Sequence, residues 1–394
     1  MESYRYLIIG GGMTGHAAAA GIRERDPDGA IAILGVEQER PYARPPLSKG
    51  LWLGKEEASV WLPDVPGVVH LTGRRALFLD PRAREVRDDA GGAYRYESLL
   101  LATGGRPRRL LLGGDPVIYF RTLADYRRLR AAPGRRAVVI GAGFIGQELA
   151  AALAQDGREV TMVFPEARVG ARSWPADLAQ QVSRVFEERG VRLLPGEAVG
   201  AVEARGGAAV VRTASGREVV GDAVVAGLGI DPDTTLAEQA GIRCEDGIVV
   251  DERLETSAPG VYAAGDVARF PSPALGGLVR VEHEDAALTM GRAAGRIMAG
   301  AAERFAHLPF FYSDLFDLGY EAVGRIDARL ETVASWTTPF REGVVYYLDR
   351  DRVQGVLLWG IFGQVEAARR LIEGRRPVAR DELLRAIGVE ARPS

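Results

Sequence analysis

Two segments of this 394-residue chain show the same order of apolar and polar positions. Segments 4–34 and 135–164 each open with an uninterrupted apolar run, followed by a glycine-rich turn, an Ala-rich stretch at helical spacing and a second apolar run. A continuous apolar run is typical of a strand that is buried on both faces of a parallel sheet. The pattern therefore predicts two βαβ units in tandem.

Alternating apolar and polar residues follow each unit. Segments 75–105 and 198–229 alternate around Gly-Gly turns, which predicts an antiparallel meander in each. After about residue 305, aromatic-rich strands and a helix over 364–373 are expected. The predicted fold class is α/β, with two Rossmann-type dinucleotide-binding domains that carry β-meander insertions and a C-terminal α+β domain.

The same pattern suggests where these domains begin and end. Residues 1–113 and 232–305 are assigned to a discontinuous first nucleotide-binding domain, and 114–231 to a second. Residues 306–394 form the C-terminal domain, for which a homodimer interface is left open.

Composition excludes several classes of partner. The net charge of −3 argues against nucleic acid or an anionic membrane surface as the main partner. No apolar stretch reaches the ~18 residues of a membrane span, so we expect neither a membrane span nor a leader peptide. The chain has one cysteine, Cys244, in a turn-rich segment where we expect a structural role. It can form no intramolecular disulfide, so a cytoplasmic location is expected, and no metal site is predicted.

The first glycine motif is Gly10-x-Gly12-x-x-Gly15. In this motif the first glycine permits a tight turn, the second lets a pyrophosphate approach the backbone, and the third lets the helix pack on the strand. The helix N-terminus at Met13 and Thr14 then offers free N–H groups to phosphates. Glu37 follows at the distance expected of an acid that binds ribose hydroxyls.

The second motif is Gly141-x-Gly143-x-x-Gly146, followed by Glu166. An acid at this position favours NADH, because a carboxylate repels a 2′-phosphate. The nearby arginines, Arg168 and Arg172, leave NADPH open as the alternative.

These residues and five further segments resemble flavoproteins of the pyridine-nucleotide oxidoreductase superfamily. Within this superfamily, the chain most resembles the branch that contains apoptosis-inducing factor and the ferredoxin and rubredoxin reductases. The segments are PYARPPLSKGLW (41–52), LLLATGGRPR (99–108), GVYAAGDVA (260–268), VRVEHEDAALTMGRAAG (279–295) and FFYSDLFDLGYEAVG (310–324). The resemblance implies FAD in the first domain and NADH in the second.

The resemblance also implies roles for single residues. Lys49 would lie beside the flavin, Glu148 would pair with it and meet the nicotinamide, and Phe144 would be a movable ring over the flavin. His283 would lie near the flavin and Tyr312 would cover it, with ordinary packing as the alternative for both and for Phe144. The further FAD residues implied are Arg44, Pro45, Ala102, Thr103, Gly104, Arg108, Gly265, Asp266 and Glu282, with solvated loops as the alternative for the two arginines. The further NAD residues implied are Ile145, Arg172 and Gly229.

The missing cysteines narrow the chemistry. Some members of the superfamily pass electrons through a pair of cysteines or through one cysteine that faces the flavin. This chain has no cysteine at those positions, so electrons are expected to leave directly from the flavin. The leading hypothesis is an FAD-dependent NAD(P)H oxidoreductase that passes electrons to a small redox protein such as a ferredoxin or rubredoxin. A diaphorase or oxidase acting on a small-molecule acceptor such as quinone or oxygen, and a redox-responsive interaction protein, are the alternatives. The clusters Arg106, Arg108, Arg109 and Arg127, Arg128, Arg130 are candidate docking sites for an acidic carrier, with ordinary surface as the alternative.

Overall fold

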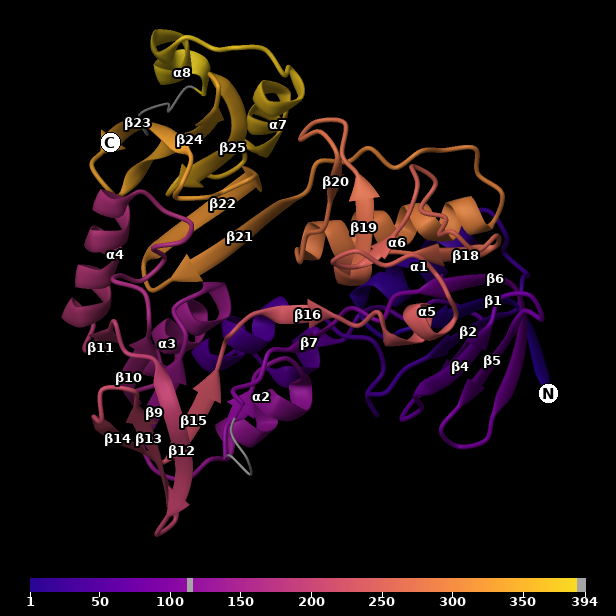
Figure 1. Ribbon diagram of the computed structural model, residues 1–394, viewed down its shortest axis with the longest axis horizontal. Helices are drawn as coiled ribbons and strands as arrows, with labels where there is room; N and C mark the ends of the chain where they lie inside the picture. Colours follow the sequence, from indigo (N-terminus) through magenta and orange to yellow (C-terminus); the bar gives the residue numbers. More distant parts are fainter. Residues whose placement is uncertain (112–115, 388–394) are drawn as a thin grey trace. The chain divides into compact units, whose positions relative to one another are not determined.

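The computed structural model describes residues 1–111 and 116–387 (Figure 1). They divide into two compact units. The first unit comprises Met1–Ala43, Ala58–Arg106 and Asp231–Phe311, and the second comprises Arg44–Glu57, Pro107–Ile230 and Tyr312–Ser394. The predicted boundary at 113/114 lies outside the described residues, and the division into three domains stays a prediction.

The first unit is built on a sheet whose parallel part carries the first βαβ segment. Its strand order is β3-β2-β1-β6-β5-β4, and β18 also pairs with β6. The strands are β1 (Glu2–Ile9), β2 (Ile31–Leu34), β3 (Val68–Leu71), β4 (Ala76–Asp80), β5 (Glu85–Asp88), β6 (Ala93–Leu101) and β18 (Val261–Ala263). All four residues of β2 and the last four of β1 are buried, as a continuous apolar run predicts for an inner parallel strand.

Strand β6 joins the meander to the parallel sheet. Its first half alternates between buried and exposed residues and pairs antiparallel with β5. Its second half ends in the fully buried run 99–101, which pairs parallel with β1 and β18. The first meander is therefore confirmed, but it continues the Rossmann sheet because a single strand carries both patterns.

Two helices of the first unit pack with almost no side chain between them. They are α1 (Met13–Arg23) and α6 (Glu284–Met298). A Cβ added at Gly295 would lie 2.0 Å from the Ala18 carbonyl oxygen, and one at Gly291 would lie 2.4 Å from that of Thr14. These contacts leave room only for glycine, so the backbones of α1 and α6 are held at close range.

Short elements complete the first unit. They are β17 (Ile248–Val249), β19 (Ala268–Pro271) and β20 (Leu278–Val279) in one small sheet, helix α5 (Thr235–Gln239), and the 3₁₀ turns η3 (Glu57–Val60) and η4 (Gly265–Val267). Strands β7 (Gly105–Pro107) and β16 (Ile230–Pro232) pair where the chain leaves and re-enters this unit.

The second unit contains the other Rossmann sheet, with order β11-β10-β9-β15-β8 and parallel pairing throughout. Its strands are β8 (Ile118–Tyr119), β9 (Arg136–Ile140), β10 (Glu159–Phe164), β11 (Arg192–Pro195) and β15 (Ala223–Ala226). The helices are α2 (Leu123–Arg130), α3 (Phe144–Gln155) and α4 (Ala176–Glu188). The predicted second meander is the antiparallel sheet of β12 (Val199–Arg205), β13 (Ala208–Thr213) and β14 (Glu218–Gly221).

The loop 44–57 belongs to this unit and forms two 3₁₀ helices, η1 (Pro45–Ser48) and η2 (Gly50–Leu53). Trp52 fixes it from inside: its ring meets Tyr126 of α2 edge-on at 5.2 Å, and its indole N–H donates to the Leu47 carbonyl at 2.8 Å. Lys49 therefore stands on a loop anchored in the core of the second unit.

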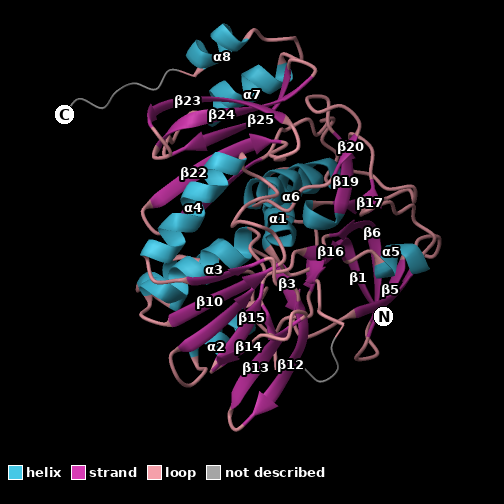
Figure 2. Ribbon diagram, turned by 60° about the vertical axis from the view of Figure 1, so that its left-hand side comes forward, coloured by secondary structure: helices cyan, strands magenta, loops and turns pink. Residues whose placement is uncertain are grey.

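The C-terminal part forms an antiparallel sheet of order β21-β22-β25-β24-β23, of which β22 to β25 are labelled in Figure 2. Its strands are β21 (Phe310–Leu315), β22 (Leu318–Gly324), β23 (Glu331–Thr338), β24 (Glu342–Asp349) and β25 (Arg352–Trp359). Helix α7 (Val365–Glu373) packs on β22 and β25, and α8 (Arg380–Ala386) packs on β23. The predicted α+β segment and the helix near 364–373 are confirmed, and with them the fold class.

Candidate functional sites

The glycine turn of the first unit is fixed by contacts with its own backbone. Gly10 has φ +125°, and an added Cβ would lie 2.0 Å from the Ala102 carbonyl oxygen. A Cβ at Gly15 would lie 2.1 Å from the Gly10 carbonyl oxygen. Gly12 begins α1 without a side-chain cap, and the first turn contains no acid. The N–H groups at this helix end are thus suited to an anion, as the motif predicts.

Three other segments predicted for FAD converge on this unit's sheet. Ala102 follows β6 directly and is buried. Gly265 has φ +76°, and a Cβ there would lie 2.3 Å from Thr14 Oγ1, so the Gly265–Asp266 turn adjoins the start of α1. Thr103 donates to the Asp233 carbonyl at 2.7 Å, and the Gly104 carbonyl accepts the Asp233 N–H at 2.9 Å. The predicted residues are therefore neighbours in space.

The predicted ribose acid, Glu37, has a partner that the sequence did not indicate. The hydroxyl of Tyr42 donates a short hydrogen bond to Glu37 Oε2. Tyr42 is buried and its ring meets Trp61 edge-on at 6.1 Å, so this partner is rigid. The bond orients the Glu37 carboxylate.

His283 directly precedes α6 and is its N-cap residue, although its side chain makes no cap hydrogen bond. Its ring stacks on Phe311 at 4.5 Å, and burial lowers the pKa of His283 to about 4. The imidazole is therefore neutral at neutral pH. The adjacent Glu282 accepts from Arg280 at 2.8 Å.

The glycine turn of the second unit repeats the close backbone contacts of the first. A Cβ at Gly141 (φ +100°) would lie 2.6 Å from the Gly227 carbonyl oxygen, and one at Gly146 would lie 2.1 Å from that of Gly141. A Cβ at Gly143 would meet no protein atom within 4 Å. The protein's own packing does not require glycine there, so the open space at the N-terminus of α3 fits the approach of a pyrophosphate.

The residues predicted to select the nucleotide also contact each other. Glu166 forms an ion pair with Arg172 at 2.5 Å, in which the carboxylate side chain is 19% exposed and the guanidinium side chain 79% exposed. Arg168 donates to Gln180 at 2.8 Å. The acid expected to bind a ribose and the cation that could bind a 2′-phosphate are thus paired with each other.

A buried polar cluster stands at the start of α3. Lys49 Nζ lies 2.8 Å from Glu148 Oε1, which is the pairing that the resemblance implies. The side chains are 13% and 5% exposed. Two serines join them, with the Ser48 hydroxyl 2.6 Å from Glu148 Oε2 and the Ser313 hydroxyl 2.7 Å from Oε1. Neither serine was among the predicted site residues, although each directly neighbours one that was.

The remaining predicted residues of the second unit lie on the surrounding loops. Lys49 Nζ is 5.3 Å from the centre of the Tyr312 ring, a cation–π contact. Arg44 donates to the Arg121 carbonyl at 2.8 Å, and Pro45 begins η1. The Arg108 N–H donates to the Gly229 carbonyl at 2.9 Å. Phe144 and Ile145 form the first turn of α3, with Ile145 40% exposed.

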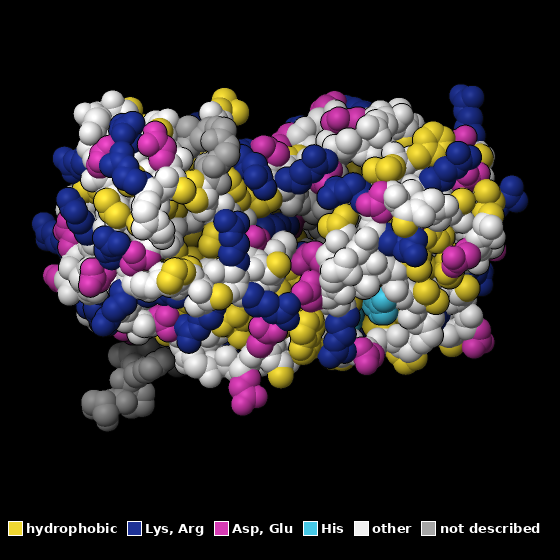
Figure 3. All heavy atoms as spheres, turned by 90° about the horizontal axis from the view of Figure 1, so that it is seen from below, with side chains coloured by type: hydrophobic (Ala, Val, Ile, Leu, Met, Phe, Trp, Pro, Cys, Tyr) yellow, Lys and Arg dark blue, Asp and Glu magenta, His cyan; other side chains and the backbone are white. Residues whose placement is uncertain are grey.

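The two arginine clusters are partly neutralised within the chain. The ion pairs are Arg106–Asp233, Arg127–Glu57 and Arg130–Asp156, and the Arg109 guanidinium carbon lies 4.8 Å from the centre of the Tyr119 ring. Figure 3 shows basic side chains interspersed with acidic ones on the face drawn. These contacts favour ordinary surface over a dedicated docking patch for both clusters.

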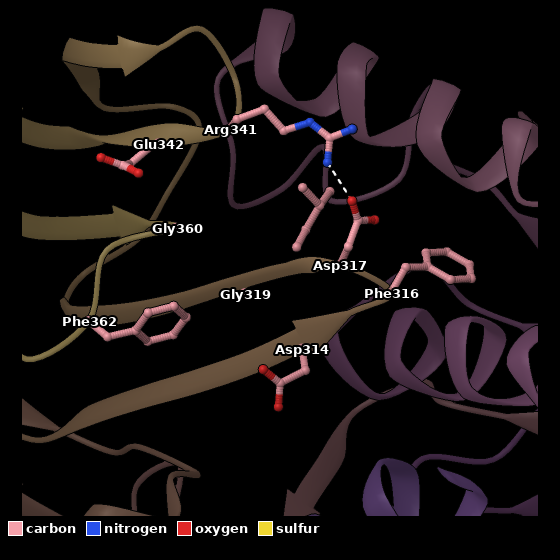
Figure 4. A pocket seen from close by; sticks show the side chains of 9 residues that line it. Asp314, Phe316, Asp317, Gly319, Arg341, Glu342, Gly360 and Phe362 are labelled. Carbon is pink, nitrogen blue, oxygen red and sulfur yellow. Dashed lines mark hydrogen bonds and ion pairs between the residues drawn. The ribbon is translucent and has the colours of Figure 1, made fainter. Parts of the chain in front are cut away.

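A pocket of about 360 Å³ lies in the C-terminal sheet of the second unit (Figure 4). Its Asp317 pairs with Arg341 at 2.7 Å and with Arg189 at 2.6 Å, and Phe362 lines another side. None of the predicted nucleotide residues lines it. In the described part of the chain, no group of three or more His, Cys, Asp or Glu could hold a metal ion, and no helix has the length and apolarity to cross a membrane.

Cys244 is partly buried. Burial, and then the charge of Glu238, raise the pKa of its thiol to about 11. Its Sγ lies 3.4 Å from the Ile242 carbonyl, within its own turn. A thiol with so high a pKa is a poor nucleophile, which supports the structural role expected for it.

Two glycine turns, each between a buried parallel strand and an uncapped helix, define a protein with two dinucleotide-binding folds. Residues 4–291 match the model of the pyridine nucleotide-disulphide oxidoreductase family. Residues 294–341 and 337–374 match the model of the apoptosis-inducing factor C-terminal domain. The chain therefore belongs to the pyridine nucleotide-disulphide oxidoreductase family, although its single cysteine can form no disulfide within it.

Individual relatives agree with the family. The ferredoxin–NAD(+) reductase component of the anthranilate 1,2-dioxygenase system of Burkholderia cepacia is 35% identical over 386 residues, which cover 94% of this chain and 95% of the relative. Apoptosis-inducing factor 1 of Dictyostelium discoideum is 30% identical, with coverages of 96% and 80%. A solved putidaredoxin reductase, in covalent complex with putidaredoxin, superposes with a TM-score of 0.89 and 30% identity over 97% of this chain and 95% of that one. The predicted resemblance is thereby confirmed.

Proposed function

We propose that the chain is an FAD-dependent NADH oxidoreductase that passes electrons to a small redox protein of the ferredoxin type. The observation that carries this is the presence of two complete glycine turns, one in each unit, in a chain with a single, unreactive cysteine. Ferredoxin reductases and putidaredoxin reductase, which match this chain over nearly its full length, support the choice of electron acceptor.

The residues of the first unit would hold FAD. The N-terminus of α1 at Gly12, Met13 and Thr14 would bind the pyrophosphate, and Glu37 would bind the ribose of the adenosine. Asp266 would bind the other end of the cofactor, next to Thr14. His283 would face the cofactor as a neutral ring, since burial keeps its pKa near 4. When bound, FAD accepts a hydride from NADH and returns electrons one at a time.

The residues of the second unit would bind NADH. Gly143 and the N-terminus of α3 would receive the pyrophosphate, and Glu166 would receive the ribose. Glu148 would accept a hydrogen bond from the nicotinamide carboxamide. The Lys49 ammonium would stabilise the electron-rich reduced flavin. Phe144 and Tyr312 would shield the nicotinamide from water.

A cytoplasmic location is also part of the proposal and rests on the low cysteine content. Fractionation of the source cells tests it.

An anaerobic titration with NADH and with NADPH, followed by visible absorbance, tests the proposal. We expect a yellow protein whose flavin bleaches with one equivalent of NADH and more slowly with NADPH. A colourless protein that acquires no flavin spectrum on addition of FAD would refute it. Reduction of ferredoxin or rubredoxin by the NADH-reduced protein then identifies the class of electron acceptor. Faster reduction of a quinone or of oxygen would instead indicate a diaphorase or an oxidase.

A second candidate function has support from the C-terminal part of the chain. That part matches the C-terminal model of apoptosis-inducing factor, and one such factor is 30% identical. A redox-responsive interaction protein would turn over slowly with every acceptor and keep a long-lived complex of reduced flavin and NAD⁺. Rapid decay of this complex when a carrier is added would exclude that function.

A further inference from the structure

The carboxylate of Glu148 is held by three donors from two other segments of the chain. Ser48 and Lys49 stand on the loop 44–57, and Ser313 stands on strand β21 of the C-terminal sheet. Because a carboxylate offers only lone pairs, each serine hydroxyl must donate to it. The Ser48 and Ser313 side chains are both buried, with residue exposures of 3% and 2%.

The donors are unevenly divided between the two oxygens. Oε1 accepts from Lys49 at 2.8 Å and from Ser313 at 2.7 Å, whereas Oε2 accepts from Ser48 alone at 2.6 Å. A carboxylate has about four acceptor positions, two on each oxygen. Three positions are filled, so the fourth lies on Oε2. The two serines thus decide which oxygen is free to accept a further donor.

Ser313 lies on strand β21, which neighbours β22 in the C-terminal sheet. Tyr320 of β22 is fully buried and stacks on Trp359 of β25 at 5.3 Å. Burial, and then the charge of Glu148, raise the pKa of Tyr320 well above its ordinary value. The sheet therefore presents a rigid, neutral wall to the Glu148 cluster.

We propose that Ser48 and Ser313 are positioning residues of the NADH site, which hold Glu148 with Oε2 turned toward the nicotinamide. This inference rests on the proposed function. It makes strand β21 a part of the site for hydride transfer, although neither glycine motif lies in the C-terminal sheet. When one of the two serines is removed, the Glu148 carboxylate can rotate more freely. Its oxygens are then no longer held in one orientation toward Lys49 and the nicotinamide.

The test compares Ser313→Ala and Ser48→Ala with the wild-type holoenzyme in anaerobic stopped-flow. We expect the rate of flavin reduction at saturating NADH to fall about tenfold in each variant. The NADH concentration that gives half of the maximal rate should change less than about twofold. The absorbance band of the reduced flavin–NAD⁺ complex, measured at saturating NAD⁺, should weaken in parallel because it reports ring overlap. Ser313→Thr, which keeps the hydroxyl, should recover most of both signals.

A double-mutant cycle shows whether the serines act through Glu148. In a Glu148→Gln background, Ser313→Ala should change the rate less than about twofold, because coupled residues are not additive. An equal loss in both backgrounds, or no loss in the wild-type background, overturns the proposal. If Ser313→Ala does not fold, Ser48→Ala carries the same cycle.

Ser272→Ala is the matched control. Ser272 is a buried serine of the first unit that accepts from the Leu275 N–H of its own loop at 3.3 Å. It should leave the rate and the absorbance band unchanged. A wild-type protein that NADH does not reduce would refute the proposed function, whereas normal reduction in both serine variants would refute only the positioning role.

Discussion

The two glycine turns of this protein have the same motif and different surroundings. In the first unit α1 is closely covered by α6, where glycines at 291 and 295 face its backbone and Gly21 faces Arg292. In the second unit α3 begins with an exposed Gly143, whose missing side chain faces empty space, and Ile145 beside it is 40% exposed. One turn is built into a core and the other opens outward.

The acids that follow the turns differ in the same way. Glu37 is oriented by the buried Tyr42, whereas Glu166 shares an ion pair with Arg172, which is almost fully exposed. A rigid, packed cradle suits a cofactor that stays bound, and an open one suits a nucleotide that exchanges at every turnover. We infer that the shared motif provides a dinucleotide site in each unit, while the packing around it determines how long the dinucleotide stays bound.

The largest expected effect breaks the packed turn. Gly295→Ala places a Cβ 2.0 Å from the Ala18 carbonyl oxygen, and neither backbone can move without separating α1 from α6. We expect a loss of about 3 kcal/mol of stability, with flavin released during gel filtration. Thermal unfolding and the flavin content per chain measure both. Unchanged values would show that this helix contact does not support the turn.

Acid should affect the first unit before the second. All four histidines, His16, His70, His283 and His307, belong to the first unit. The pKa of His283 is lowered from 6.5 to about 4 by burial, so the unfolded chain binds a proton that the folded chain rejects. Stability should therefore be full well above pH 6.5, fall by about 2 kcal/mol as the pH drops to 5, and continue to fall toward pH 4.

His283→Phe removes this titration and keeps a neutral ring against Phe311. Denaturant unfolding at pH 7 and pH 5 should show a smaller decline for the variant than for the wild type. Equal declines would assign the acid sensitivity to other groups, of which His70 is the first candidate because burial lowers its pKa too.

The open turn should tolerate a methyl group in the protein but not in its complex with the nucleotide. Gly143→Ala meets no protein atom within 4 Å, so the melting temperature should stay the same. The KM for NADH should rise about tenfold, because the backbone no longer approaches the pyrophosphate. Steady-state kinetics against a fixed artificial acceptor measures this. A lower melting temperature with normal KM would reverse our assignment of the two turns.

The smallest expected effect concerns the choice of nucleotide. Glu166→Ala should reduce the preference for NADH over NADPH about fivefold, since the 2′-phosphate no longer faces a carboxylate. Arg172→Ala should weaken NADPH use and cost less than about 1 kcal/mol of stability, because its ion pair is exposed. Ratios of kcat/KM for the two nucleotides check both variants. A Glu166→Ala variant with an unaltered ratio would remove Glu166 from nucleotide selection.

Local patterns predicted the elements well, and the reason lies in their periods. Segments 4–34 and 135–164 fold as strand, glycine turn, helix and strand, because a covered parallel strand requires a continuous apolar run. Strand β6 shows where such reading ends, since one strand serves both the meander and the parallel sheet. The sequence could not show that the loop 44–57 belongs with residues 107–230, since that grouping depends on contacts such as Trp52 on Tyr126.

The sequence by itself determined the two nucleotide motifs, the lone cysteine and the pairing of Lys49 with Glu148 that its family resemblance implied. Only the tertiary structure decided that Ser48 and Ser313 share the Glu148 carboxylate, that Tyr42 holds Glu37 and that Arg172 covers Glu166. The physical reason is distance along the chain. Motifs are read within a few residues of each other, whereas Glu148 and Ser313 are 165 positions apart and meet only when separate sheets pack.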